Sequence, residues 1–157
     1  METLVQIIEK EGDLFYTDTE HTLVHCISAD CKMGAGIAKQ FRARYPEMPQ
    51  ALLEYIKERQ VVGRGSVGTA IYYLSDSESK HDVINLITKK FYWQKPTYET
   101  FIKAVRDLHR VVVKHDIRCL AMPRIGCGLD KLEWSRVRST LEEVFKHNSI
   151  IIYVYTL

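Results

Sequence analysis

Apolar positions along this chain fall into short runs separated by longer stretches with helical spacing. The short runs, rich in β-branched residues, predict strands at residues 4–8, 23–27, 67–74, 83–88, 119–122 and 150–155. Several runs are apolar on successive residues, which is typical of strands covered on both faces. The polar stretch SDSESKHD at residues 75–82 predicts a surface connection between two strands.

Between these runs, helical patterns predict helices at residues 37–45, 50–60, 98–115 and 132–147. In the third, Phe101, Val105, Leu108 and Val112 recur at spacings of three and four, which gives one apolar stripe. Strands that alternate with helices predict a three-layer α/β fold.

Composition limits the class of protein. The length of 157 residues is that of one domain, and 46% apolar with 27% charged residues is an ordinary globular balance. The longest apolar run, 150–155, is far shorter than the roughly 20 residues of a membrane helix, so we expect no membrane partner. Without a readable secretory signal, we expect a nuclear or cytoplasmic protein that is not secreted.

The cysteines and histidines raise the question of a metal. His21, His25, Cys26 and Cys31 are close in sequence, but their spacing is not one that structural zinc sites favour. Alternation along a strand would also point His25 and Cys26 to opposite faces. We therefore expect no metal, reduced thiols, and Cys26 and Cys119 as small core residues.

The net charge of +2 gives a weakly basic chain with two local basic clusters. These are Lys39, Arg42 and Arg44, and Lys89, Lys90 and Lys95. Most such residues belong to solvated faces, so a nucleic-acid-processing module is a third and weaker hypothesis.

Two glycine loops follow predicted strands, MGAGI at residues 33–37 and RIGCGL at 124–129. In α/β folds ligands bind at the carboxyl ends of strands, and N–H groups at a helix start favour anionic oxygens. Each loop alone is as well explained by a tight turn, but together they could hold a diphosphate. No Gly-Lys-Ser/Thr follows either loop, and the third glycine of the dinucleotide fingerprint is missing, which argues against ATPases and dehydrogenases.

At this point the chain resembles the macrodomain family, in the branch of the terminal ADP-ribose protein glycohydrolases. The matching segments are GDLF at 12–15, HCIS at 25–28, MGAGIA at 33–38, YYL at 72–74, LITKK at 86–90, KPTYE at 95–99, MPRIGCGLD at 122–130 and VYTL at 154–157. The resemblance implies one macrodomain over residues 1–157, with a three-layer α/β/α fold around a central mixed, mostly parallel sheet of about six strands. It also implies a monomer without a cofactor.

The resemblance further implies the residues of the site. Lys89 and Asp130 are the reactive pair, Asp13 contacts the adenine of ADP-ribose, and the glycine loops hold the diphosphate and the distal ribose. The implied ADP-ribose-binding residues are Asp13, Leu14, Ser28, Met33, Gly34, Ala35, Gly36, Ile37, Pro123, Arg124, Ile125, Gly126, Cys127, Gly128, Leu129 and Leu157.

The chain departs from the family at two places. Other macrodomains carry Asn-Ala-Ala-Asn after the second strand, whereas residues 27–30 here read ISAD, which excludes an asparagine-dependent mechanism. Residues 75–85 are an added stretch. It is neutral if it forms an exposed hairpin at the far edge, and it could alter acceptor choice if it leans over the ligand.

Both reactive residues have plain structural explanations. A Lys-Lys pair at a strand end is usually solvated, and alternation allows only one of Lys89 and Lys90 to face a cleft. Asp130 and Glu133 fit a capping box that starts the last helix, although a cap beside a glycine loop could serve both purposes.

The resemblance implies removal of mono-ADP-ribose from aspartate and glutamate esters of proteins, extending to O-acyl-ADP-ribose or ADP-ribosylated nucleic acid. Lys89 would attack the distal ribose and Asp130 would act as acid and base. The amine must first be neutral, either through burial or by proton transfer to Asp130. A non-catalytic reader of ADP-ribose is the alternative.

Overall fold

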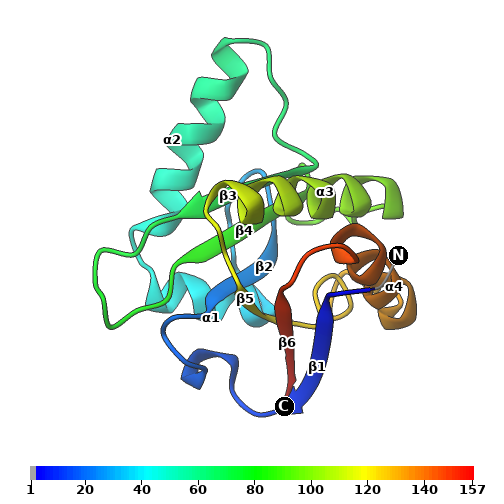
Figure 1. Cartoon of the computed structure of the whole chain (residues 1–157). Helices are drawn as coiled ribbons and strands as arrows, with labels where there is room; N and C mark the ends of the chain where they lie inside the picture. The colour runs from blue at the N-terminus through cyan, green and yellow to red at the C-terminus, as the bar shows by residue number, and fades with distance from the viewer. Residues whose placement is uncertain (1–2) are drawn as a thin grey trace.

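The computed structural model describes residues 3–157, and Met1 and Glu2 of the predicted domain lie outside the described residues. Its strands form one six-stranded sheet in the order β1-β6-β5-β2-β4-β3 (Figure 1). They are β1 (Gln6–Glu11), β2 (Thr22–Ser28), β3 (Thr69–Tyr73), β4 (Val83–Lys89), β5 (Cys119–Pro123) and β6 (Ile151–Thr156). Only β3 among them is antiparallel to its neighbour, so the predicted mixed, mostly parallel sheet is confirmed.

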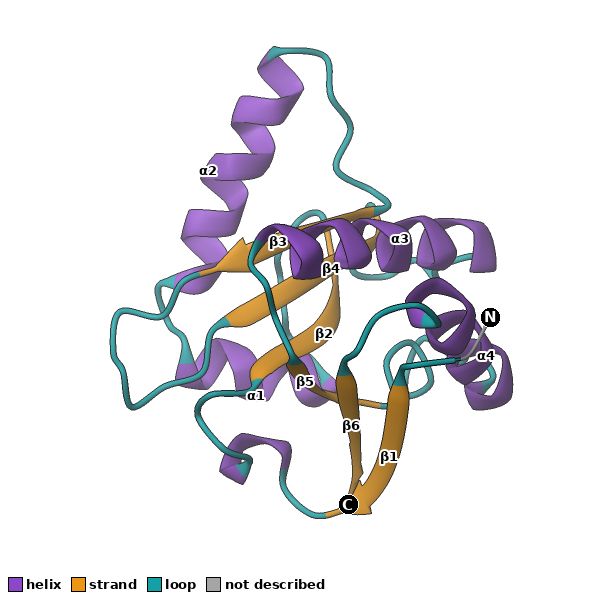
Figure 2. Ribbon diagram, viewed as in Figure 1, coloured by secondary structure: helices purple, strands orange, loops and turns teal. Residues whose placement is uncertain are grey.

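Helices cover both faces of this sheet (Figure 2). They are α1 (Gly36–Arg44), α2 (Met48–Val61), α3 (Tyr98–Lys114) and α4 (Trp134–Phe145), with a short 3-10 helix, η1 (Leu14–Tyr16). Side chains of α3 and α4 form one apolar core with one face of the sheet, and those of η1, α1 and α2 form a second core with the other face. The three-layer α/β/α prediction is therefore confirmed.

The two central strands explain why the sequence folds this way. Residues of β2 and β4 are buried at almost every position, because each strand is covered from both sides. Phe101 and Leu108 of the α3 stripe are fully buried on one side, and Phe41 of α1 is fully buried on the other. Burying a large apolar side chain stabilises a fold by about 1.5–3 kcal/mol, so these contacts fix the layers.

Most predicted boundaries differ from the observed ones by one to three residues, and two elements illustrate why. The first strand was predicted at residues 4–8 but runs from Gln6 to Glu11, because it lies at the sheet edge, pairs only with β6, and tolerates polar side chains. The last helix was predicted from residue 132 but begins at Trp134. Both errors are at element ends, where local pattern is weakest.

The added stretch, residues 75–85, lies away from the carboxyl ends of the strands. Residues 75–82 connect β3 to the first residue of β4, whereas Lys89 is the last residue of that strand. The remaining residues, 83–85, are buried within β4 itself. The stretch thus lies at the opposite end of β4 from Lys89, which agrees with the neutral of the two expected outcomes.

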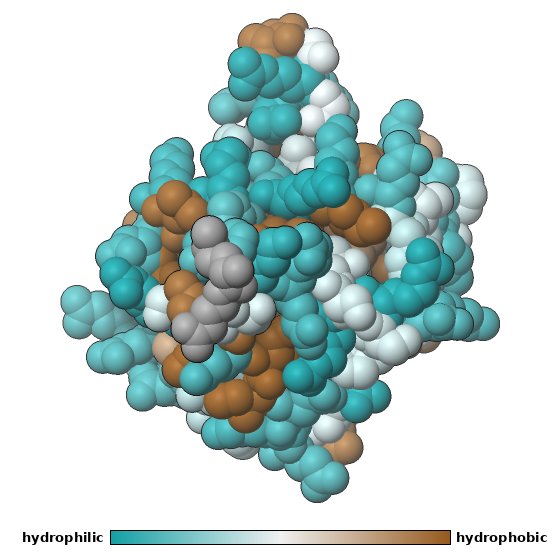
Figure 3. All heavy atoms as spheres, turned by 45° about the vertical axis from the view of Figure 1, so that its right-hand side comes forward, coloured by the Kyte–Doolittle hydropathy of each residue, from teal (hydrophilic) through white to brown (hydrophobic). Residues whose placement is uncertain are grey.

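The helix α2 projects from the rest of the molecule (Figure 1). Val61 and Val62 at its end are 86% and 68% exposed, and the tip at the top of Figure 3 is correspondingly apolar. Among the described residues, none of the helices has the length and apolar content needed to cross a bilayer.

Candidate active site

A cavity of about 1350 Å³ opens at the carboxyl ends of the five parallel strands. It is larger than the 300–1,000 Å³ of most small-ligand pockets, so an elongated ligand fits it. Every residue that the sequence predicted for the site lines this cavity. The strand ends contribute Gly12 after β1, Ser28 from β2, Lys89 from β4, Pro123 from β5 and Leu157 after β6.

The first glycine loop leads directly into α1 at the cavity wall. Gly36, the first residue of the helix, has φ +59°, a conformation that favours glycine. Ala35 precedes it and forms no side-chain cap, so the N–H groups of the first turn lack a capping side chain. These N–H groups carry the positive end of the helix dipole, which suits a phosphate oxygen.

The second glycine loop faces the first across the cavity. Gly126 has φ +73°, and a Cβ there would lie 2.8 Å from Leu132 Cδ1, so only glycine fits without a shift. The N–H of Leu132 donates to the carbonyl oxygen of Gly126 at 2.8 Å, which closes the turn. A Cβ on Gly36 would meet Leu129 Cδ1 at 3.4 Å, which shows how closely the two loops approach.

Lys89 and Asp130 meet at one end of this cavity. The ammonium Nζ of Lys89 donates to Asp130 Oδ1 at 2.7 Å, and the side chains are only 13% and 15% exposed. At the end of the β2–β4 pair the register shifts, so that Ser28 pairs with Lys89. Lys90 is exposed. The prediction that only one of the two lysines faces the cleft is confirmed.

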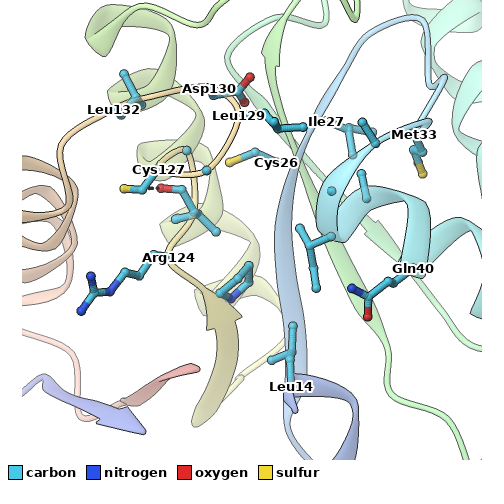
Figure 4. A pocket seen from close by; sticks show the side chains of 18 of the residues that line it. Leu14, Cys26, Ile27, Met33, Gln40, Arg124, Cys127, Leu129, Asp130 and Leu132 are labelled. Carbon is cyan, nitrogen blue, oxygen red and sulfur yellow. Dashed lines mark hydrogen bonds between the residues drawn. The ribbon is translucent and has the colours of Figure 1, made fainter. Parts of the chain in front are cut away.

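The predicted capping role of Asp130 was wrong. The residue that precedes α4 is Glu133, and its side chain caps no N–H group. Lys131, with φ +62°, turns the chain between Asp130 and the helix. The carboxylate of Asp130 therefore contacts Lys89 rather than a helix end. Figure 4 shows Asp130 beside Leu129 among the residues that line the cavity.

Asp30 connects two loops of the site, a role that the sequence did not predict. Its carboxylate accepts from the Ser28 hydroxyl and from the N–H groups of Lys32 and Tyr92, at 3.2 and 2.9 Å for the two N–H groups. Tyr92 follows β4, whereas Asp30 follows β2. The chain thus uses an aspartate of its ISAD segment to fix the loop that follows Lys89.

A second charged network involves Arg124 and Trp134, which also line the cavity. Glu9 of β1 accepts from Arg124 at 3.2 Å and from Trp134 Nε1 at 3.0 Å, and the Arg124 guanidinium lies 5.5 Å from the centre of the Trp134 ring. Nearby, Asp13 accepts from the Phe15 N–H at 2.9 Å and caps η1. This hydrogen bond uses only Oδ1 of the Asp13 carboxylate, so Oδ2 takes no part in it.

Sequence reasoning missed other residues that line the cavity. They are Gly12, Cys26, Ile27, Lys32, Ala38, Gln40, Arg42, Tyr92, Lys95, Leu132, Trp134, Tyr155 and Thr156. Most lie within one or two residues of a predicted position, so their neighbours carried the only available signal.

Cys26 packs against the core, as predicted, but it also borders the cavity. It is half-buried and lines the cavity, and Figure 4 shows it between Asp130 and Ile27. Burial raises the pKa of the Cys26 thiol, and burial raises that of Cys127 to about 11. Both thiols are therefore protonated near neutral pH.

His25 lies on the other face of β2, as alternation predicted. Its Nε2 and Asn85 Oδ1 are 2.6 Å apart, and its ring stacks on Phe41 with centroids 3.8 Å apart. Burial lowers the pKa of His25 to about 4. Within residues 3–157, no group of three or more His, Cys, Asp or Glu side chains is placed to hold a metal ion.

Comparison with known proteins places these features in a family. The Macro domain family matches residues 24–141. The ADP-ribose glycohydrolase OARD1 of Bos taurus is 42% identical over 147 residues, covering 94% of this chain and 89% of that protein. The DNA ADP-ribosyl glycohydrolase of Mycobacterium tuberculosis is 35% identical over 139 residues, which cover 86% of this chain but 37% of that protein.

Solved structures agree on the fold. The macrodomain of Thermus aquaticus DarG superposes with a TM-score of 0.80 over 98% of this chain and 99% of that one, at 22% identity. An identity this low supports the architecture alone. Together with the family match and the 42% identical relative, the fold and the cleft show that the chain belongs to the macrodomain family.

Proposed function

We propose that this protein is an ADP-ribosyl hydrolase that releases mono-ADP-ribose from aspartate and glutamate esters of proteins. The observation that carries the proposal is the contact between Lys89 and Asp130, 2.7 Å apart at a cavity lined by two glycine loops. Relatives named as ADP-ribose glycohydrolases support the same class of reaction. We further propose that one macrodomain unit acts as a monomer, without a cofactor, in the nucleus or cytoplasm.

In this proposal the ligand lies along the cavity. The free carboxylate oxygen of Asp13 faces the adenine, and the N–H groups at the start of α1 and in the second glycine loop bind the diphosphate. The distal ribose then lies beside Lys89, at the end where Asp130 is held. This order follows the cavity from η1 and β1 to the end of β4.

The reaction proceeds in two steps. In the first, Asp130 accepts a proton from Lys89, and the amine Nζ attacks C1″ of the ribose. The bond from C1″ to the ester oxygen breaks, and the bonding electrons leave with the acceptor carboxylate. Asp130 then passes its proton to that carboxylate, which leaves as the carboxylic acid, and Asp130 becomes a carboxylate again. A carboxylate is a stable leaving group, so the ester needs less acid assistance than a serine ether would.

In the second step, water resolves the lysyl adduct. Asp130 accepts a proton from a water molecule whose oxygen attacks C1″, and the C1″–N bond breaks as Nζ recovers a proton. The products are free ADP-ribose and the acceptor carboxylic acid, and both residues return to their starting states. Of the two routes to a neutral amine, the 2.7 Å contact favours transfer to Asp130.

A non-catalytic reader would use the same cavity without the reactive pair. The test is to incubate a peptide ADP-ribosylated on glutamate with wild type, Lys89→Ala and Lys131→Gln, and to measure free ADP-ribose. Lys131 is exposed beside Asp130 and does not line the cavity, so Lys131→Gln is the matched control. We expect release by wild type and Lys131→Gln and none by Lys89→Ala. Tight ADP-ribose binding without release by wild type would instead identify a reader.

A further inference from the structure

Lys95 is a cation of the cavity that the proposed reaction does not use. It lies in the segment between β4 and α3, it is exposed, and it lines the cavity. Its Nζ donates to the carbonyl oxygen of Leu129 at 2.5 Å. An ammonium group has three N–H donors, so this contact leaves two of them for a ligand.

The contact with Leu129 places Lys95 at the reactive end of the cavity. Leu129 is bonded to Asp130 (Figure 4), so the lengths of the intervening bonds keep Lys95 Nζ within roughly 6.5 Å of the Asp130 Cα. Asp130 accepts from Lys89 Nζ at 2.7 Å. Two lysines therefore lie close to the same aspartate, Lys89 at its carboxylate and Lys95 at its backbone.

Hydrogen bonds fix the backbone on both sides of Lys95. Tyr92, three residues before it, donates its N–H to Asp30 at 2.9 Å. After it, a capping box fixes the start of α3, and the Tyr98 hydroxyl accepts from the N–H of Glu133 at 2.9 Å. This second bond joins the segment to the loop between β5 and α4. Lys95 therefore extends from a backbone that is positioned before a ligand binds, which lowers the entropic cost of binding.

The charges that line the cavity leave Lys95 without an anionic partner. They belong to five cationic and two anionic side chains, Lys32, Arg42, Lys89, Lys95 and Arg124, and Asp13 and Asp130. Lys89 and Arg124 each pair with a carboxylate. Lys32 and Arg42 flank the first glycine loop in sequence, and the Arg42 guanidinium donates to the Lys32 carbonyl oxygen at 3.2 Å. Over residues 3–157, no carboxylate side chain forms an ion pair with Lys95, so its charge is available to an anion that arises beside Lys89.

We propose that Lys95 binds the carboxylate that leaves the ribose. In the bound ester, an N–H of Lys95 Nζ donates to the carbonyl oxygen of the acceptor's acyl group. When the C1″–O bond breaks, the bonding electrons leave with that group, and the negative charge spreads over both of its oxygens. The hydrogen bond then joins two charged partners, so it is stronger in the transition state than in the bound ester and accelerates the first step.

The proton balance of the reaction is unchanged by this role. The proton that Asp130 accepted from Lys89 still passes to the leaving carboxylate, and Lys95 stays protonated throughout. A serine ether has only the oxygen of the breaking bond, so it offers no second oxygen to Lys95. The contact therefore favours aspartate and glutamate acceptors. The inference rests on the proposed function, because it assigns a further residue to the same reaction.

Rapid-quench mass spectrometry with enzyme in excess over a glutamate-linked ADP-ribosyl peptide tests the role. Release of the peptide reports the first step, and we expect Lys95→Gln to slow it about tenfold, with the Kd for free ADP-ribose unchanged. Lys95→Arg keeps the charge and should restore most of the rate. Lys90→Gln is the matched control, because it removes an equal charge from the same segment, but Lys90 lies against the Phe91 ring and does not line the cavity.

The second step separates this role from support of the Asp130 loop. Decay of the ADP-ribosyl adduct, isolated by rapid gel filtration, should be equal in wild type and Lys95→Gln, because the carboxylate has already left. Equal slowing of both steps, or peptide release by Lys95→Gln at the wild-type rate, would overturn the inference and leave the proposed function standing. Absence of release by wild type would overturn both.

Discussion

Acidification should destabilise this protein through His25, which supports the first wall of the cavity. The imidazole is fully buried against Phe41 of α1. The Asn85 side-chain oxygen can accept a hydrogen bond from His25 Nε2 only when Nε2 carries a proton. The other ring nitrogen, Nδ1, is buried without a hydrogen-bond partner. Protonation would therefore place a charge and an unpaired N–H group in the core, which explains why the pKa is lowered to about 4 from 6.5.

The magnitude follows from linkage. Because the folded pKa is depressed, the unfolded chain binds more protons between pH 6.5 and pH 4, and stability falls as pH falls through that window. The full loss is about 3 kcal/mol, at 1.36 kcal/mol for each pKa unit, and about 2 kcal/mol of it occurs between pH 7 and pH 5. A typical domain has a total stability of about 5–15 kcal/mol, so the effect is measurable.

Urea unfolding at pH 7, 6 and 5 gives the free energy of unfolding at each pH. The comparison variant is His25→Gln, whose amide can still donate to Asn85 but does not titrate. It should be less stable than wild type at pH 7, because it loses the stack on Phe41, but it should lack the extra loss of about 2 kcal/mol. Parallel pH profiles for the two proteins would refute the reasoning.

Three further predictions follow from the site and the core. Gly126→Ala should lower the free energy of unfolding in urea by about 1–3 kcal/mol, because of the positive φ and the contact with Leu132. Gly128→Ala has open space at its Cβ and should change that free energy by less than about 0.5 kcal/mol. Equal losses for the two variants would contradict this explanation of the loop. Alkylation of Cys127, followed by peptide mass spectrometry, should still accelerate with pH above pH 9, because burial raises its pKa to about 11; a plateau near pH 9 would argue against burial. Phe101→Ala should cost about 3–5 kcal/mol, since this ring is fully buried, and a loss below about 1 kcal/mol would mean that the ring is not part of a packed core.

The predictable part of the fold is the part whose pattern is dictated by burial. Residues 83–88 are apolar in succession because β4 is covered on both faces, and residues 98–115 carry one stripe because α3 is covered on one face. The first strand was misplaced because β1 lies at an edge, where polar side chains are tolerated and the apolar signal fades. Its true bounds depend on its pairing with β6, which is distant in sequence.

The candidate site divides in the same way. Both glycine loops were recognisable because each follows a strand and places glycine where φ is positive, as at Gly36 and Gly126. The network around Glu9 could not be recognised from the sequence, because Glu9 and Arg124 are 115 residues apart in the chain. The capping box that the local pattern offered as an alternative for Asp130 did not form, because the contact with Lys89, 41 residues away, prevailed.

The pairing of Lys89 with Asp130 as nucleophile and proton acceptor is most directly tested by intact mass spectrometry during turnover of a glutamate-linked ADP-ribosyl peptide. The account predicts that wild type forms a transient covalent ADP-ribosyl adduct that maps to Lys89, and that Asp130→Ala forms it more slowly, because Asp130 accepts the Lys89 proton before the attack. It also predicts that Lys89→Ala forms no adduct and releases no ADP-ribose. Release by Lys89→Ala at the wild-type rate, or an adduct that maps to another residue, would contradict it.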